Sequence, residues 1–324
     1  MLTSIIRRLL YSAVVLLVAS FLIFTFVSVS GDPLSVLKMS PGVDPATIEN
    51  ITQRKHLDDP IIVRYAYWLK DAVTDQFGTT IIGERKIMPD IQRVVPHTLQ
   101  LVIAAELLAI TLAISIGVYS ALRQYSVFDY MATTFSFLGL ATPVFWLALM
   151  LQVLFVNVYL WWDIRIFYTA NLSGVDPGTG IDFVLDRAQH LALPVIVLSI
   201  ANIATYSRYM RGAMLEVINS DYVRTARAKG LKERSVVMRH AFRNALIPLT
   251  TVVALNFGAV IGGVVVTETV FGLDGMGFYF INALNSGDPY PVMAWLMIAA
   301  SAVILFNLLA DITYGILDPR VRHD

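Results

Sequence analysis

The sequence predicts an all-α integral membrane protein with six transmembrane helices. Hydrophobic residues make up 56% of the 324 residues and charged residues only 15%, which is too apolar for a soluble domain of this length. Six uncharged or nearly uncharged runs also have the length of about 20 residues with which a helix crosses the hydrocarbon core. Much of the remaining charge is concentrated in one basic stretch between two of these runs. Together these observations indicate a chain that crosses the membrane several times.

The six predicted transmembrane helices cover 9–29, 98–122, 131–160, 190–208, 247–270 and 291–315. The third run is longer than one crossing needs and contains Thr142-Pro143, so we expect a tilted or kinked helix there. The first run follows Arg7-Arg8 and loosely imitates a signal peptide. Its 21 uncharged residues exceed the roughly 7–15 of a signal-peptide core, which favours a retained helix.

The distribution of basic residues predicts the orientation of the chain, because short loops on the cytoplasmic side retain Lys and Arg. Nine Arg or Lys residues occur beside three acids in 208–243. The stretch 161–189 has four aspartates and two arginines, and 271–290 has two aspartates and no basic residue. We therefore expect both termini in the cytoplasm. The segments outside the membrane are then a cytoplasmic N-terminus at 1–8, an external segment at 30–97, a cytoplasmic coupling loop at 209–246 and a cytoplasmic tail at 316–324.

The external segment contains a predicted amphipathic helix. Asp59-Pro60 resembles an N-cap followed by proline at the first helical position, and Gly78 marks the expected end. One helical face collects six apolar or aromatic side chains, which are Ile61, Tyr65, Trp68, Leu69, Ala72 and Val73. We expect this face to cover the outer ends of the transmembrane helices, and docking of an external protein is the alternative.

Sequence motifs for catalysis and metal binding are missing. The chain lacks the G-x-x-x-x-G-K-[ST] phosphate loop, the H-E-x-x-H metal pair and the G-x-S-x-G elbow, and it has no cysteine. All five histidines fall at or outside the ends of the predicted transmembrane helices. We therefore predict no catalytic residue, no metal site and no cofactor bound by this chain.

Glu106 is the acid expected deepest in the membrane, because it lies eight residues beyond Thr98 and thus about 12 Å along a helix. An ionisable group at that depth is a functional candidate, although a neutral or hydrogen-bonded carboxyl between helices is the more common case. A second set lies in the fifth predicted helix, where a polar asparagine and two glycines suit either a translocation pathway or close helix packing. These candidate pathway residues are Asn256, Phe257, Gly258 and Gly262.

The basic segment predicts two short helices. Asn219, Ser220 or Asp221 could cap the first, and Gly230 suits the left-handed position that ends a helix, so we expect it to end at Lys229. The second helix is expected over 232–244.

The first of these helices is predicted to be amphipathic. Tyr222 and Ala226 stack one turn apart, as do Arg224 and Arg227, which leaves an apolar face beside a basic one. Such a short helix is marginal in water, so it needs a partner to pack against. A loop that only sets topology or contacts anionic lipid headgroups is the alternative.

The basic loop resembles the E-A-A-x-x-x-G signature of permease subunits in binding-protein-dependent ABC importers. Here the signature runs from Arg224 to Gly230, with Arg224-Thr225 in place of Glu-Ala, and the strings DYVRTARAKG and RHAFRNALIP resemble the oligopeptide and dipeptide branch. Three further strings follow the order of that family, and they are ATPVFW, GGVVVTETVF and NLLADITYGILDPRVR. FGLDGMG and GDPYPVM differ from the family's usual proline-glycine and arginine-containing versions. The long external segment resembles the first, B-type, permease of peptide importers.

The resemblance implies a type I ABC importer permease fold with a cytoplasmic coupling helix, in the cell membrane of a prokaryote. The chain would form half of a peptide translocation pathway and would have no ATPase site of its own. The implied partners are a homologous second permease, two ATPase subunits or domains that bind ATP and Mg, an external solute-binding protein and membrane lipid. The residues implied to couple to the ATPase are Asp221, Tyr222, Val223, Arg224, Thr225, Ala226, Arg227, Ala228, Lys229, Gly230 and Leu231.

Two other functions stay open at this point. An ion-coupled secondary transporter would use Glu106 and transport without an ATPase, whereas a membrane anchor or scaffold would tolerate replacement of Asn256. The cargo is also open, because relatives in the resembled family carry dipeptides, longer peptides, glutathione or nickel complexes.

Overall fold

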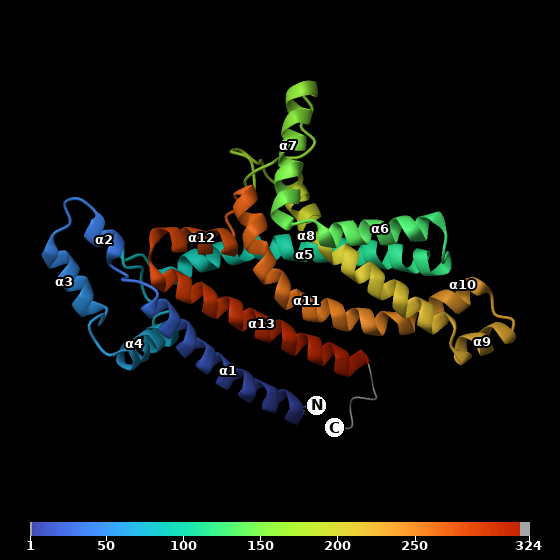
Figure 1. Cartoon of the computed structure of the whole chain (residues 1–324), viewed down its shortest axis with the longest axis horizontal. Helices are drawn as coiled ribbons and strands as arrows, with labels where there is room; N and C mark the ends of the chain where they lie inside the picture. The colour runs from blue at the N-terminus through green and yellow to red at the C-terminus, as the bar shows by residue number, and fades with distance from the viewer. Residues whose placement is uncertain (1, 318–324) are drawn as a thin grey trace. The chain divides into compact units, whose positions relative to one another are not determined.

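The computed structural model describes the backbone of residues 2–317 and the side chains of residues 6–256 and 264–309. Helices dominate this part of the chain (Figure 1). The residue contacts divide the chain into two compact units. Unit 1 joins the chain up to Thr98 with Asp274–Leu305, and unit 2 joins Leu99–Leu273 with the chain from Phe306 onward.

Unit 1 contains short helices as well as parts of long apolar ones. The helices are α1 (Leu2–Val29), α2 (Ser35–Met39), α3 (Pro45–Arg54), α4 (Ile61–Thr74), α12 (Met276–Ser286) and the first parts of α5 (Ile87–Leu122) and α13 (Pro289–Leu317). The sequence predicted only the helix now seen as α4 in the external segment. α3 shows the local signal that was missed, because Asp44 accepts a hydrogen bond from the Ala46 amide and Pro45 takes the first helical position.

The aromatic face of α4 forms a core with α1 and α13. Trp68 is buried beside Phe24 and Met293, and the Tyr65 hydroxyl lies 2.7 Å from the Ser20 hydroxyl. Val73, which the sequence placed on the same face, is 78% exposed. Five residues at about 100° each rotate it roughly 140° around the helix axis from Trp68, so it lies beyond the edge of the packed face.

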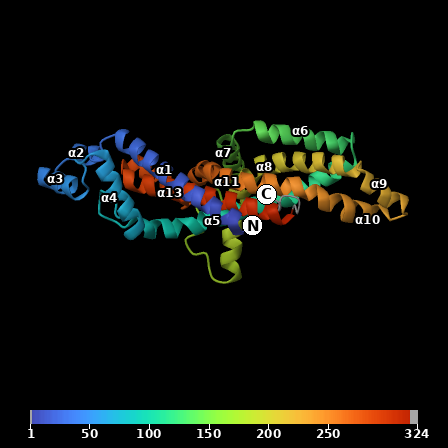
Figure 2. The same cartoon turned by 90° about the horizontal axis from the view of Figure 1, so that it is seen from below.

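Unit 2 contains the remaining helices. They are the rest of α5, α6 (Val127–Ala141), α7 (Val144–Trp162), α8 (Ile181–Ile218), α9 (Asp221–Ala228), α10 (Glu233–Ser235), the π-helical turn η1 (Val236–Ala241), α11 (Phe242–Phe271) and the end of α13. α6 and α11 both pack along α8, as two views of the chain show (Figure 1, Figure 2). Buried side chains of α5, α8 and α11 form one core with those of α9 and η1 in the basic loop.

The predicted third transmembrane helix, 131–160, is two helices in the structure. α6 ends at Ala141 and α7 begins at Val144, with Thr142 and Pro143 in extended conformations at ψ of 121° and 132°. Proline disfavours the helical conformation of the residue before it and offers no N–H to continue the ladder. The chain therefore breaks at this dipeptide instead of bending, and α7 alone has the length of a crossing.

Five helices in the described residues are long and apolar enough to cross a membrane, and a sixth crossing is possible if the α11 end and α12 are counted together. The five are Ile6–Val29, Ile87–Leu122, Val144–Trp162, Ile181–Ile218 and Pro289–Leu309. α5, α8 and α13 extend beyond the predicted spans 98–122, 190–208 and 291–315. These lengths and this composition indicate a multi-pass membrane protein.

Candidate functional site

The basic loop between α8 and α11 contains the short helix α9. Asp221 in its first turn places a negative charge at the positive end of the helix dipole. Gly230 has a φ of +76°, a left-handed conformation that glycine adopts without strain, and the chain leaves the helix there. Ser220 occupies the N-cap position, but its hydroxyl donates to the Val217 carbonyl at 2.6 Å instead of capping α9.

The inner face of α9 is buried within the chain itself. Val223 is fully buried and Ala226 nearly so, in a cluster that includes Met214 of α8 and Val236 and Ala241 of η1. The packing partner that a two-turn helix requires is therefore provided by the flanking helices. Val223 and Ala226, which the resemblance placed among the ATPase-coupling residues, are 0% and 5% exposed within this chain.

The outer face of α9 is exposed and mostly polar, and Tyr222 is its one aromatic residue. Its hydroxyl accepts a hydrogen bond from Asn244 at 3.1 Å, and the rest of the ring is accessible. The other exposed members of the predicted set are Asp221, Arg224, Thr225, Arg227, Ala228, Lys229, Gly230 and Leu231. The helix thus presents a mainly basic surface away from the core.

The two arginines of α9 differ in their surroundings. Arg227 donates two hydrogen bonds to the Glu233 carboxylate, at 2.8 and 3.2 Å, and this contact lowers the pKa of Glu233. Arg224 lies 3.4 Å from Asp221, and both side chains are exposed. Arg227 therefore closes the turn after α9, whereas Arg224 is held only by a loose surface pair.

The second predicted helix of the loop, 232–244, differs from the structure. The chain forms the short α10, then the π-helical turn η1, and continues without a break into α11. Val236, Val237 and Ala241 of η1 are buried against α9 and α8. Tertiary packing of these three side chains thus holds a helical geometry that sequence periodicity does not reveal.

An ion pair that was not anticipated from the sequence joins the C-terminal part of α8 to the start of α6. Arg211 donates from Nε and Nη2 to the two Asp129 oxygens of α6, at 2.6 and 2.7 Å. Asp129 also accepts from the Ser120 hydroxyl of α5 and from the Tyr125 amide. These contacts, led by Arg211, hold the pKa of Asp129 well below its ordinary value. The Asp129 carboxylate thus accepts four hydrogen bonds and joins α5, α6 and α8.

Glu106 is 2% exposed and lies between helices of unit 2. Its carboxylate accepts from Asn202 at 2.8 Å and from the Tyr206 hydroxyl at 3.1 Å, both on α8. The contacts with Asn202 and Tyr206 match a hydrogen-bonded carboxyl between helices. The pathway candidates Phe257, Gly258 and Gly262 lie outside the residues whose side chains are described.

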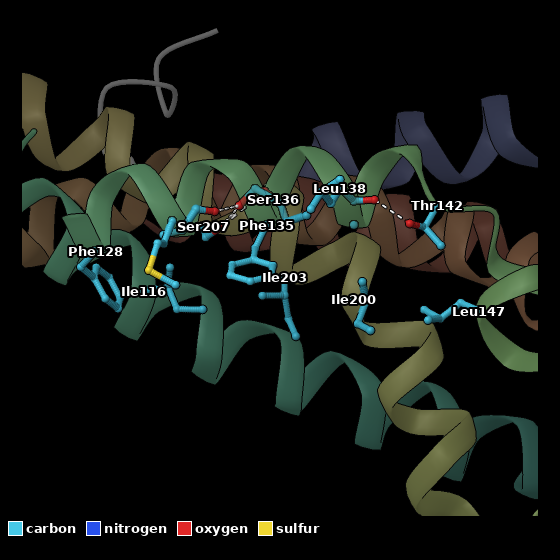
Figure 3. A pocket seen from close by; sticks show the side chains of 14 residues that line it. Ile116, Phe128, Phe135, Ser136, Leu138, Thr142, Leu147, Ile200, Ile203 and Ser207 are labelled. Atoms are coloured by element: carbon cyan, nitrogen blue, oxygen red, sulfur yellow. Dashed lines mark hydrogen bonds between the residues drawn. The ribbon is translucent and has the colours of Figure 1, made fainter. Parts of the chain in front are cut away.

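An apolar cavity of about 570 Å³ opens between α6, α8 and Ile116 of α5 (Figure 3). Its side chains include Phe135, Ile200 and Ile203, and the Ser136 and Ser207 hydroxyls meet at 3.3 Å on its wall. Asn256, the one pathway candidate whose side chain is described, does not line this cavity. Its walls offer almost no polar group to a peptide, so the cavity adds no polar recognition site. The described residues also contain no cluster of His, Cys, Asp or Glu that could hold a metal ion.

Comparison with known proteins defines the class of this chain. Residues 113–323 match the family described as binding-protein-dependent transport system inner membrane component, and residues 1–101 match the N-terminal model of the same kind of membrane component. The chain belongs to this family of membrane permeases. Family membership and the satisfied hydrogen bonds of Glu106 weigh against the ion-coupled transporter considered from the sequence.

Several relatives are similar over nearly their whole length. The oligopeptide transport system permease protein AppB of Bacillus subtilis is 39% identical over 321 residues, which cover 98% of this chain and 99% of the relative. OppB of Mycobacterium tuberculosis H37Rv is 38% identical over 320 residues, covering 98% of each chain. The di/tripeptide permease DppB of Pseudomonas aeruginosa is 38% identical over 307 residues, covering 91% of each chain.

One solved structure is similar in fold. The crystal structure of an amino acid ABC transporter with histidines superposes with a TM-score of 0.50 at 14% identity, covering 70% of this chain and 94% of that chain. At this identity the likeness concerns the fold alone, and it is consistent with the type I permease fold.

Proposed function

We propose that this chain is the permease subunit of an ATP-driven peptide importer and forms half of its translocation pathway. The observation that carries the proposal is the end-to-end similarity, at 34–39% identity, to proteins named as oligopeptide, dipeptide or peptide permeases. The basic outer face of α9 adds a structural reason, because it is a fixed and accessible surface at the end of α8.

The importer requires partners that supply what this chain lacks. A homologous second permease completes the pathway, two ATPase subunits or domains bind ATP and Mg, and an external solute-binding protein delivers the peptide. The membrane is the cell membrane of a prokaryote, with both termini and the basic loop in the cytoplasm. This orientation follows from the retention of Lys and Arg on the cytoplasmic side.

The coupling surface consists of the outer face of α9 and the turn after it. Arg224, Lys229 and Leu231 are exposed there, while Val223 and Ala226 attach the helix to α8 and η1. Closure of the ATPases around ATP moves α9, and the buried inner face passes this movement to the transmembrane helices. The Tyr222 ring is partly exposed and can become further buried in a partner's cleft. Full burial of such a side chain contributes up to about 1.5–3 kcal/mol to the binding free energy.

Charge reversal tests the coupling surface. In a purified complex with all subunits present, Arg224→Glu combined with Arg227→Glu is expected to lower peptide-stimulated ATP hydrolysis several-fold. Lys70→Glu, which reverses an exposed charge on α4, is the matched control and should leave the rate unchanged. Unaltered coupling in the fully assembled double variant would rule out this surface.

The internal role of Arg227 needs a separate variant. Arg227→Glu with Glu233→Arg exchanges the two charges and can restore the ion pair within the loop. Recovery of coupling in this exchange variant assigns Arg227 to the turn, and continued loss assigns it to the partner. Purification of the native complex, with mass identification of its subunits and bound ligand, tests the importer assignment and identifies the cargo.

A further inference from the structure

A second cavity, in unit 1, lies where α1 ends and α13 begins. It has a volume of about 530 Å³ and lies between the end of α1, α12 and the first turns of α13. Residues of the external segment, among them Asp32, Leu57 and Arg64, complete its wall. α1 and α13 are both long and apolar enough to cross a membrane, and they meet in one core within this unit. The cavity therefore lies at the level where these two helices leave the hydrocarbon.

Most of the wall is apolar and part of it faces outward. Phe24, Val292 and Met293 are buried in the wall, and Phe26 on the rim is 76% exposed. Only 11% of the most apolar window of α1 is buried in the chain. The cavity thus opens beside a helix whose surface suits contact with lipid chains.

Arg64 is the uncompensated charge of this cavity. Its side chain is half-buried, with the guanidinium carbon 5.9 Å from the centre of the Phe24 ring. Among the residues whose side chains are described, no carboxylate forms an ion pair with it. A guanidinium held against an aromatic ring still presents its N–H groups, and these suit a phosphate or carboxylate.

The two acids of the cavity wall are already engaged. Asp32 pairs with Lys38 at 2.6 Å, and its other oxygen accepts from the Leu34 amide. Asp288 is buried and accepts from the amides of Ile81 and Tyr290, at 2.6 and 3.0 Å. Neither acid therefore neutralises Arg64, and the wall as a whole favours an occupant with an anionic group and an apolar body.

We propose that this cavity binds a phospholipid, with the phosphate at Arg64 and an acyl chain along Phe24, Met293 and Leu296. The level of the cavity in the membrane, the outward-facing rim and the unpaired guanidinium all favour a lipid over a peptide segment. In the proposed orientation of the chain this lipid belongs to the outer leaflet. Its binding holds the end of α1 against α13 and is separate from contact with an ATPase.

Lipid retention measures the site directly. The intact complex is purified in detergent containing a fixed fraction of phosphatidylglycerol, and native mass spectrometry counts the lipid that stays bound. Arg64→Leu is expected to reduce retention at this site about fivefold, the contribution of a single cation beside an anionic lipid. Arg64→Lys should keep most of the retention because the charge remains.

A second pair of variants separates charge from shape. Leu284→Trp places bulk in the cavity without altering charge and should also lower retention. Arg54→Leu removes an exposed arginine that pairs with Glu84 outside the cavity, and it should have no effect. Equal retention by the parent and Arg64→Leu overturns the proposal, as does an image of the complex with a partner protein's side chains in the cavity. Lipid counts do not depend on peptide uptake, so this result is independent of the transport assignment.

Discussion

Arg211 contacts both oxygens of the Asp129 carboxylate, at 2.6 and 2.7 Å, and thereby joins α8 to the start of α6. Asp129 is 3% exposed, and the arginine side chain is 28% exposed. Breaking a buried ion pair leaves a charge without a partner, which costs about 3–5 kcal/mol, and the partial exposure of Arg211 reduces this to roughly 2–4 kcal/mol. Arg211 lies on the segment of α8 that leads into α9.

We therefore expect Arg211→Leu to destabilise unit 2. The unfolding midpoint of the purified chain in detergent should fall, and the double exchange Asp129→Arg with Arg211→Asp should recover part of the loss. Arg224→Leu removes one member of an exposed pair with Asp221 and should change stability by no more than about 1 kcal/mol. If Arg211→Leu and Arg224→Leu lowered the unfolding free energy equally, the burial of Asp129 would not explain the strength of its ion pair.

The same ion pair predicts a pH dependence. Because the folded-state pKa of Asp129 is depressed, its stabilising contribution is complete above the unfolded-state value of about 3.9 and is lost as the pH falls toward the folded-state value. Between pH 5 and 8, the difference in unfolding free energy between the parent chain and Asp129→Asn should stay constant. Below about pH 4 the difference should shrink. Thermal unfolding of both proteins across pH measures this, and a difference that shrinks near pH 6 would refute the assignment.

Replacement of Val223 tests whether the inner face of α9 packs within this chain or against an ATPase. Val223→Ala removes buried methyl groups from the contact with α8 and η1, and we expect a loss of about 1–2 kcal/mol in the stability of the isolated permease. Thr225→Ala on the exposed face is the control. If Val223 instead packed into an ATPase cleft, its replacement would weaken assembly and leave the isolated chain unchanged.

Gly117 marks a close approach of α5 to α8. A Cβ atom at this position would lie 2.7 Å from the Ser207 carbonyl oxygen and 2.7 Å from the Met210 Cβ. Gly117→Ala should therefore cost about 1–3 kcal/mol through overpacking. Gly212→Ala on α8 meets no atom within 4 Å, so it should be neutral or slightly stabilising through higher helix propensity. Comparing the unfolding of these two variants separates steric from propensity effects.

Much of the fold could be predicted because the helices depend on patterns of neighbouring residues in the sequence. The length of the apolar runs indicated the membrane helices, and Gly230 with the preceding basic stretch indicated α9. The Thr142-Pro143 dipeptide marked an irregularity in the third run, although a bend was expected and a break is found. Short helices such as α3 and α12 were missed because their apolar faces are too brief to stand out from the surrounding segments.

The sequence by itself determined the membrane class, the basic loop and the family resemblance, since each depends on residues that are close together in the chain. Tertiary structure decided which side chains of that loop are accessible: Val223 is turned inward by its contacts with α8 and η1. It also decided the partners of Glu106, which lie 96 and 100 positions away, and of Arg211, which lies 82 positions from Asp129. Such pairings depend on how helices pack and rotate against one another, and hydrophobic periodicity within a single helix carries no information about them.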